Sequence, residues 1–98
     1  MPTVEIEVLF WRDIPAAVTV RTPDRSTRLE MPIRFAEAID AVSSRFTADS
    51  VSQAWRFATA QIETEDPQDA AENAVRQLDK SYGPARLNAL IANDGNAV

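Results

Sequence analysis

The sequence predicts an α+β fold, with a small, mostly antiparallel sheet of three to four strands and two to three helices packed on one face. Two observations predict this class. Residues 3–31 alternate apolar and polar side chains with the two-residue period of strands, whereas later segments repeat with the helical period. The length of 98 residues fits a single domain, residues 1–98, and the chain contains no repeat or linker that would mark a second one.

The expected strands share one pattern, with apolar side chains on one face and polar side chains on the other. They comprise residues 3–10, 17–21, 27–31 and 56–63. Arg12–Pro15 predicts a connector after the first strand, because proline disfavours helical backbone at the residue before it. The turn signal at residues 22–26, with Pro23 at its second position, predicts that the second and third strands form a hairpin.

Three apolar stripes with helical spacing predict helices in the rest of the chain. They extend over residues 33–46, 67–82 and 84–93. Asp66 followed by Pro67 predicts the cap and the first turn of the second helix. Gly83 predicts the end of that helix.

Two shorter segments have weaker signals. Either Asp49 or Ser50 is the expected cap of a short turn that holds Val51 and Trp55. Residues 95–98 follow the last helix, and we expect them to fray.

Composition excludes several classes of function. The chain has no cysteine and no histidine, which rules out zinc fingers, disulfide frameworks, thiol nucleophiles and Ser-His triads. With 10 basic and 15 acidic residues, the net charge of −5 argues against a nucleic-acid partner. The sequence shows neither a signal peptide nor the roughly 18 apolar residues of a membrane span, so we expect a cytoplasmic protein with no membrane partner.

The most unusual local sequence is Phe10–Pro15, which places an aromatic ring, a cation and an anion at the end of a strand. Loops at strand ends commonly build sites. Trp11 is therefore a candidate interface or stacking residue, and Arg12 is a candidate for gripping a carboxylate or phosphate, with Asp13 beside them. In the structural alternative, Trp11 closes the core while Arg12 and Asp13 lie in solvent or pair with nearby charges. The sequence leaves both interpretations open.

A second pair of the same residue types occurs at Trp55 and Arg56. If the segment before it folds over the sheet, Trp55 approaches Trp11. The alternative is that Trp55 covers the core, because large aromatic side chains dominate small cores. Arg34 completes the set of candidate binding residues.

We expect no catalytic residue, no metal site and no cofactor. The serines have no histidine partner, and two glycines are too few for a phosphate-binding loop. The carboxylates between residues 63 and 69 match no calcium loop, and Asp66 has a simpler role as a helix cap. A domain this small rarely encloses the roughly 300–1,000 Å³ of a usual ligand pocket. The chain is therefore not expected to be an enzyme in isolation.

Residues 10–18, Phe-Trp-Arg-Asp-Ile-Pro-Ala-Ala-Val, resemble the opening motif of the bacterial "virulence factor" domain family. The resemblance continues through residues 32–40, Trp55–Arg56 and residues 85–93, and thus covers nearly the whole chain. The family takes its name from a domain of a larger protein with helical repeats, and it defines no catalytic residue. The resemblance implies an accessory role in one-carbon metabolism, beside methylenetetrahydrofolate reductase-like and corrinoid methyl-transfer proteins.

Two functions remain open at this point. The first is a subunit that binds a larger one-carbon enzyme. Its candidate contacts are Trp11, Arg12, Asp13, Trp55 and Arg56. The second is a small module that binds an anionic ligand, with Arg12, Arg34 and Arg56 gripping a folate glutamate or a phosphate.

Overall fold

A computed structural model describes residues 3–97, and within them it contains four strands and four helices. In chain order the elements are β1 (Thr3–Trp11), β2 (Ile14–Arg21), β3 (Ser26–Glu30), α1 (Ile33–Ser43), α2 (Ala48–Gln53), β4 (Trp55–Glu63), α3 (Pro67–Ser81) and α4 (Pro84–Ala92). The predicted α+β class is confirmed, and so is the order of the strands and helices along the chain. None of the helices in this part of the chain is long and apolar enough to cross a membrane.

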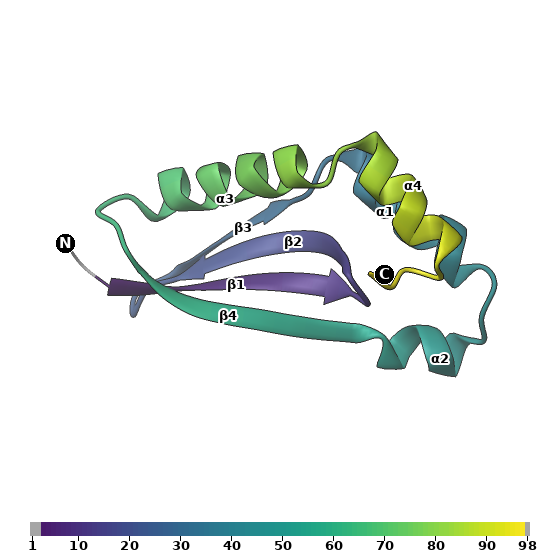
Figure 1. Cartoon of the computed structure of the whole chain (residues 1–98). Coiled ribbons are helices and arrows are strands. Elements are labelled where there is room, and N and C mark those ends of the chain that lie inside the picture. Colours follow the sequence, from purple (N-terminus) through teal and green to yellow (C-terminus); the bar gives the residue numbers. More distant parts are fainter. Residues whose placement is uncertain (1–2, 98) are drawn as a thin grey trace.

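The four strands form one antiparallel sheet in the order β3-β2-β1-β4 (Figure 1). The hairpin predicted at residues 22–26 joins β2 to β3. The last strand, β4, returns beside β1 and forms one border of the sheet. Its register with β1 is continuous from Thr3 opposite Glu63 to Trp11 opposite Trp55.

The connector between β1 and β2 is shorter than the sequence predicts. It consists of Arg12 and Asp13 alone, because β2 already begins at Ile14. Pro15 lies opposite Phe10 while Ala17 lies opposite Leu9, so the ladder contains a bulge at this point. A bulge leaves one residue out of the hydrogen-bonding pattern, which lets a strand accept a proline without losing a ladder bond.

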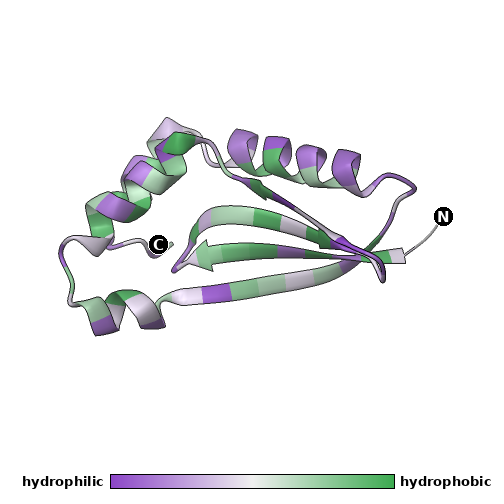
Figure 2. Cartoon of the chain, turned by 180° about the vertical axis from the view of Figure 1, so that it is seen from behind, coloured by the Kyte–Doolittle hydropathy of each residue, from purple (hydrophilic) through white to green (hydrophobic). Residues whose placement is uncertain are grey.

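One part of the core lies between α3 and the sheet. The helix packs on β2 and β3, with its polar side turned away from the strands (Figures 1 and 2). Val4, Val20 and Ala71 are buried there, as the alternation in the first two strands predicts. Asp66 caps the helix as predicted, since its carboxylate accepts hydrogen bonds from the backbone N–H groups of Gln68 and Asp69.

The larger part of the core lies at the other end of the sheet, where α1 packs against β2 and against α4 (Figure 1). Its fully buried side chains come from β1, β2 and α1. They are Trp11, Ile14, Val18, Phe35 and Val42. Leu87 and Leu90 of α4 complete this cluster.

The segment between α1 and β4 differs from the prediction. Helix α1 ends at Ser43, so Phe46 lies outside it; the hydroxyl of Ser44 donates to the carbonyl of Ala41, a local bond that competes with helix continuation. Thr47, rather than Asp49 or Ser50, is the cap of α2, because its hydroxyl accepts from the N–H of Ser50. Trp55 does not belong to this helix but opens β4.

The expected fraying after α4 is also wrong for the part of it that the structure describes, whereas Val98 lies outside the described residues. Gly95 is buried, and its carbonyl accepts a hydrogen bond of 2.9 Å from the N–H of Asp13. The N–H of Ala97 donates to the Asp13 carboxylate at 2.6 Å. The segment after α4 is therefore fixed to the turn between β1 and β2.

Candidate binding site

Trp11, the most conspicuous residue of the sequence, lies inside the core. Its side chain is completely buried, and its indole N–H donates a hydrogen bond of 3.1 Å to the carbonyl of Val51. This is the structural alternative considered from the sequence. A residue in this position offers no surface to a partner, although it does hold α2 against the end of β1.

Arg12 makes several contacts inside the chain. Its backbone has a φ of 53°, in the left-handed region, and its N–H donates to the carbonyl of Ala54. The guanidinium stacks over the rings of Trp11 and Phe46 and donates to the carbonyl of Asp94 at 2.7 Å. Together these contacts hold a strained turn residue in place. The guanidinium that the sequence suggests as a ligand contact is thus bound within the chain itself.

Asp13 and Arg56 do come together, as partners of each other. The Arg56 guanidinium lies 2.9 Å from the Asp13 carboxylate and also donates to the carbonyl of Arg12. The hydrogen bond from the Ala97 N–H is the main reason that the pKa of Asp13 is lowered below its ordinary value of 3.8; Arg56 adds to this, and partial burial opposes it. Through Asp13, the turn between β1 and β2 is thus bonded both to the start of β4 and to the segment after α4.

Arg34 belongs to a different part of the molecule. Its side chain extends from α1 to α3. There its Nη2 donates a hydrogen bond of 2.9 Å to the backbone carbonyl of Asp79 and one of 2.5 Å to the carboxylate of the same residue. Its guanidinium also lies over the ring of Phe35. Arg12 and Arg56 contact other partners, Asp94 and Asp13, at the turn between β1 and β2. The structure therefore does not bring the three arginines of the anionic-ligand hypothesis into one cluster, and that hypothesis stays an untested prediction.

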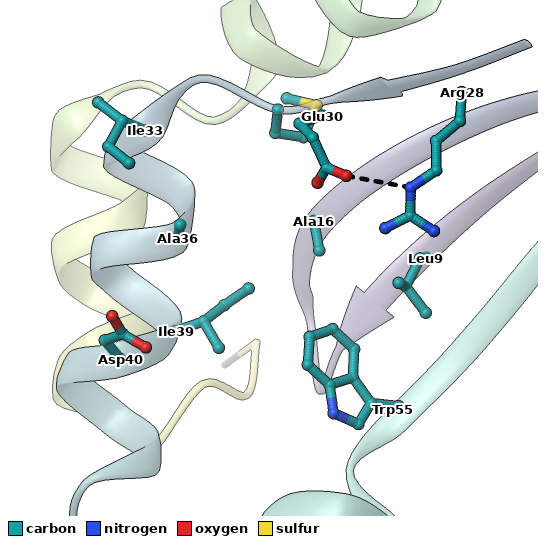
Figure 3. Close-up of a pocket in the computed structure, with 10 residues that line it drawn as sticks. Leu9, Ala16, Arg28, Glu30, Ile33, Ala36, Ile39, Asp40 and Trp55 are labelled. Carbon is teal, nitrogen blue, oxygen red and sulfur yellow. Dashed lines mark hydrogen bonds and ion pairs between the residues drawn. The ribbon is translucent and has the colours of Figure 1, made fainter.

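The most prominent concave surface is a groove between α1 and the end of the sheet (Figure 3). Its volume is about 530 Å³. The apolar part of its lining comes from β1, β2, β4, α1 and the residue after β3. These residues are Leu9, Ala16, Met31, Ile33, Ala36, Ile39 and Trp55. We call this surface the apolar groove.

The apolar groove coincides with the most exposed large apolar side chains of the described residues. Ile33 is 72% exposed and Trp55 is 42% exposed. Phe57, which is 62% exposed, lies opposite Leu9 in the sheet and two residues after Trp55, so all three share one sheet face. The strand contacts of α3 are mainly with β2 and β3.

Polar groups in the apolar groove are few. Arg28 and Glu30 pair with each other across 3.0 Å, and Asp40 lies on α1 on the other side (Figure 3). The volume reaches the range of ligand pockets, although the groove is open to solvent rather than enclosed. What this lining offers is apolar contact with a negatively charged rim, rather than a convergent set of reactive groups.

Sequence reasoning identified one residue of the apolar groove, Trp55, and missed the others. A signal was present in β1 and β4. Leu9 and Phe57 are apolar at positions where the alternation of these strands turns side chains toward the face of Glu5 and Glu7. Two apolar residues on an otherwise polar face indicate a surface that is not simply solvated.

One of the comparisons with known proteins gave a match. The family model described as "Virulence factor" matches residues 9–91, which is most of the chain. A search of curated proteins and a search of solved structures gave no match. The matched range includes the turn residues 11–13, the apolar groove and all of β4.

Proposed function

The chain belongs to the virulence factor domain family, and from this starting point we propose that it is a non-catalytic accessory protein that binds a larger protein through the apolar groove. One observation supports this proposal above the others. Of the large apolar side chains that remain exposed, Ile33 and Trp55 line one groove, and Phe57 lies opposite Leu9 of the same groove in the sheet. Clustered exposed apolar residues are typical of docking surfaces.

The polar residues argue in the same direction. Arg12, Arg34 and Arg56 each form hydrogen bonds within the chain, so a ligand would compete with an existing partner of each guanidinium, although Nη1 of Arg34 is buried without one. The apolar groove requires no such exchange, because its exposed side chains face solvent. A partner that covers Trp55 and Ile33 would gain about 25 cal/mol of binding free energy for each Å² of apolar surface removed from water.

The rim of the apolar groove indicates the chemistry of the partner. Arg28 and Glu30 of the lining pair with each other, so Asp40 supplies the excess negative charge of the rim, and the chain as a whole carries a net charge of −5. A partner segment with an apolar anchor side chain flanked by lysine or arginine would complement both features. The family resemblance of the sequence favours an enzyme of one-carbon metabolism, similar to methylenetetrahydrofolate reductase or to a corrinoid methyl-transfer protein, as the protein that carries this segment.

Co-expression with each of these two kinds of enzyme from the same host tests the proposal. We expect the chain to elute with one of them in size-exclusion chromatography. Ile33→Glu and Trp55→Ala should weaken the complex more than about tenfold, because both remove anchor contacts at the centre of the surface. Ile33 and Trp55 are exposed, so the variants should retain the circular dichroism spectrum of the wild type.

Ala85→Glu is the matched control. Ala85 is exposed on α4, and α4 contributes no residue to the apolar groove. This variant should bind as the wild type does. If neither enzyme elutes with the wild-type chain, or if Ala85→Glu is as harmful as Ile33→Glu, the proposed function is wrong.

A further inference from the structure

Strand β4 has an unusual environment for a strand of nine residues. Within residues 3–97 it pairs with β1 on one side only, and its other edge has no partner in the sheet. Every one of its side chains is exposed except that of Ile62, which is half-buried. Figure 1 shows β4 at the border of the molecule away from α3. Its free N–H and C=O groups therefore form a continuous, accessible edge.

The edge strands of β-sheets are usually protected against pairing with another chain, and β4 lacks the usual protection. Charged side chains, prolines, bulges and short length all discourage the addition of another strand. The segment Phe57–Ile62 contains no charge and no proline, and the β1–β4 ladder has no bulge. The opposite edge, β3, is only five residues long and carries Arg28 and Glu30. The difference indicates that the β4 edge is built to be paired.

We propose that the occupant of the β4 edge is the β4 strand of a second copy, related by a two-fold axis perpendicular to the sheet. Pairing centred on Thr59 uses the whole strand and places each Ala58 opposite the partner copy's Ala60. Small side chains at this position allow close approach. The result is a continuous eight-stranded antiparallel sheet, in which both copies use the same surface.

The charges of β4 favour this arrangement over the parallel one. Arg56 lies near the start of the strand and Glu63 is its last residue. In an antiparallel pair centred on Thr59, Arg56 lies opposite Ile62 and Glu63 lies opposite Trp55 of the other copy, so each end of the interface carries one charge of each sign and no like charges are paired. A parallel pair would place like charges side by side. At the axis itself the two Thr59 side chains face each other, and Thr–Thr pairs are favourable across antiparallel strands.

The dimer leaves the apolar groove accessible. A two-fold axis perpendicular to the sheet keeps both copies the same way up, so the two apolar grooves open on the same side of the extended sheet. A single strand pair falls below the roughly 1,200 Å² of a standard interface, so the dimer should dissociate on dilution. The inference does not rest on the proposed function, since it concerns the backbone edge of β4, although Trp55 and Phe57 of that strand also belong to the proposed docking surface.

Sedimentation velocity of the full chain over a concentration series tests the pairing. The wild type should shift from monomer to dimer as its concentration rises. Thr59→Lys should remain monomeric over the same range, because two ammonium groups would meet at the axis, whereas the exposed site opposite Glu7 accepts a lysine in the monomer. Ser26→Lys, an exposed position on the other edge strand, should dimerise as the wild type does.

A crosslinking experiment tests the register. The chain has no cysteine, so a single one can be introduced without a background reaction. Directly opposite residues in antiparallel strands have Cβ atoms about 4.5–5.5 Å apart, near the range that a disulfide needs. Thr59→Cys should therefore form a covalent dimer rapidly under mild oxidation. The two copies of Gln61→Cys would lie roughly 13 Å apart along the strands and should react slowly.

Each outcome decides the inference. It is overturned if the wild type is monomeric at every concentration, if Thr59→Lys dimerises normally, or if Thr59→Cys and Gln61→Cys crosslink at equal rates. Dimerisation that Ile33→Glu abolishes and Thr59→Lys leaves intact would assign the contact to the apolar groove and would also overturn it. Loss of partner binding by Ile33→Glu, with the dimer unchanged, would separate the proposed function from this inference.

Discussion

Gly95 lies directly against the indole ring of Trp11. Its φ is +87°, and a methyl group at its α-carbon would lie 3.0 Å from Cζ3 of Trp11 and 3.4 Å from Cδ of Arg12. The residue is buried, and its carbonyl accepts the N–H of Asp13. The glycine thus allows the chain after α4 to pass closely over the ring that fills the end of the core.

Gly95→Ala should destabilise the fold by about 1–3 kcal/mol, because a side chain is strained at this backbone angle and also contacts Trp11 too closely. Urea denaturation followed by circular dichroism measures this change. Gly83→Ala is the control, since a methyl group there has no neighbour within 4 Å. At that helix cap, the lost preference for glycine and the gained chain stiffness should nearly cancel. Equal losses in the two variants would contradict the packing described at Gly95.

Replacement of Arg12 should show the left-handed strain at this position. Arg12→Ala loses the hydrogen bond to Asp94 and the stacking over two rings but keeps the strained φ. Arg12→Gly loses the same contacts and adopts the angle freely. We expect Arg12→Ala to be less stable than Arg12→Gly by about 1 kcal/mol, measured by the midpoint of urea unfolding. The reverse order would show that residue 12 is not held in the left-handed region in solution.

Asp13 should make the stability depend on acid pH. Its pKa in the folded protein lies below the ordinary value of 3.8, so its contribution is present above that pH and is lost as the pH falls through the folded value. Asp13→Asn does not titrate there. The stability difference between the wild type and the variant should therefore shrink as the pH is lowered below about 4. A difference that stays constant down to pH 2 would be inconsistent with the ionised contacts to Ala97 and Arg56.

The two tryptophans should contribute very differently to stability. Trp11→Phe creates a cavity and leaves the carbonyl of Val51 without its indole donor, so we expect a loss of about 2 kcal/mol. Trp55→Phe changes an exposed side chain and should cost less than about 0.5 kcal/mol. Thermal or urea unfolding of both variants measures the contrast. Similar losses would mean that Trp55 is also part of the folded core.

The elements could be predicted because their signals are local. Strand alternation around Val4 and the Asp66–Pro67 helix start depend on neighbouring residues and a single periodicity, and the structure has both. The errors occur where a distant segment decides. Pro15 belongs to β2 because of a bulge opposite β1, and Gly95 is ordered because a turn more than eighty positions away binds the residues after α4.

The candidate site was harder to predict for the same reason. Conspicuous residue types drew attention to Trp11 and Arg12, but residue type does not reveal whether an aromatic ring faces the core or the solvent. The apolar groove consists of ordinary residues such as Leu9 and Ile33, which become a surface only when strand order and helix position leave them uncovered. That information lies in the packing of α1 and β4, which short-range patterns do not contain.

The bond between Asp13 and Ala97 joins residues 84 positions apart, and this affects how the protein is made. A ribosome completes the β1–β2 turn early, but it adds residues 94–97 only after all the other described elements. Until then the indole of Trp11 lacks its cover, and the nascent chain carries an unfinished core. The end of the core around Trp11 can therefore close only after residues 94–97 have been made, and until then the growing chain exposes apolar surface that favours aggregation.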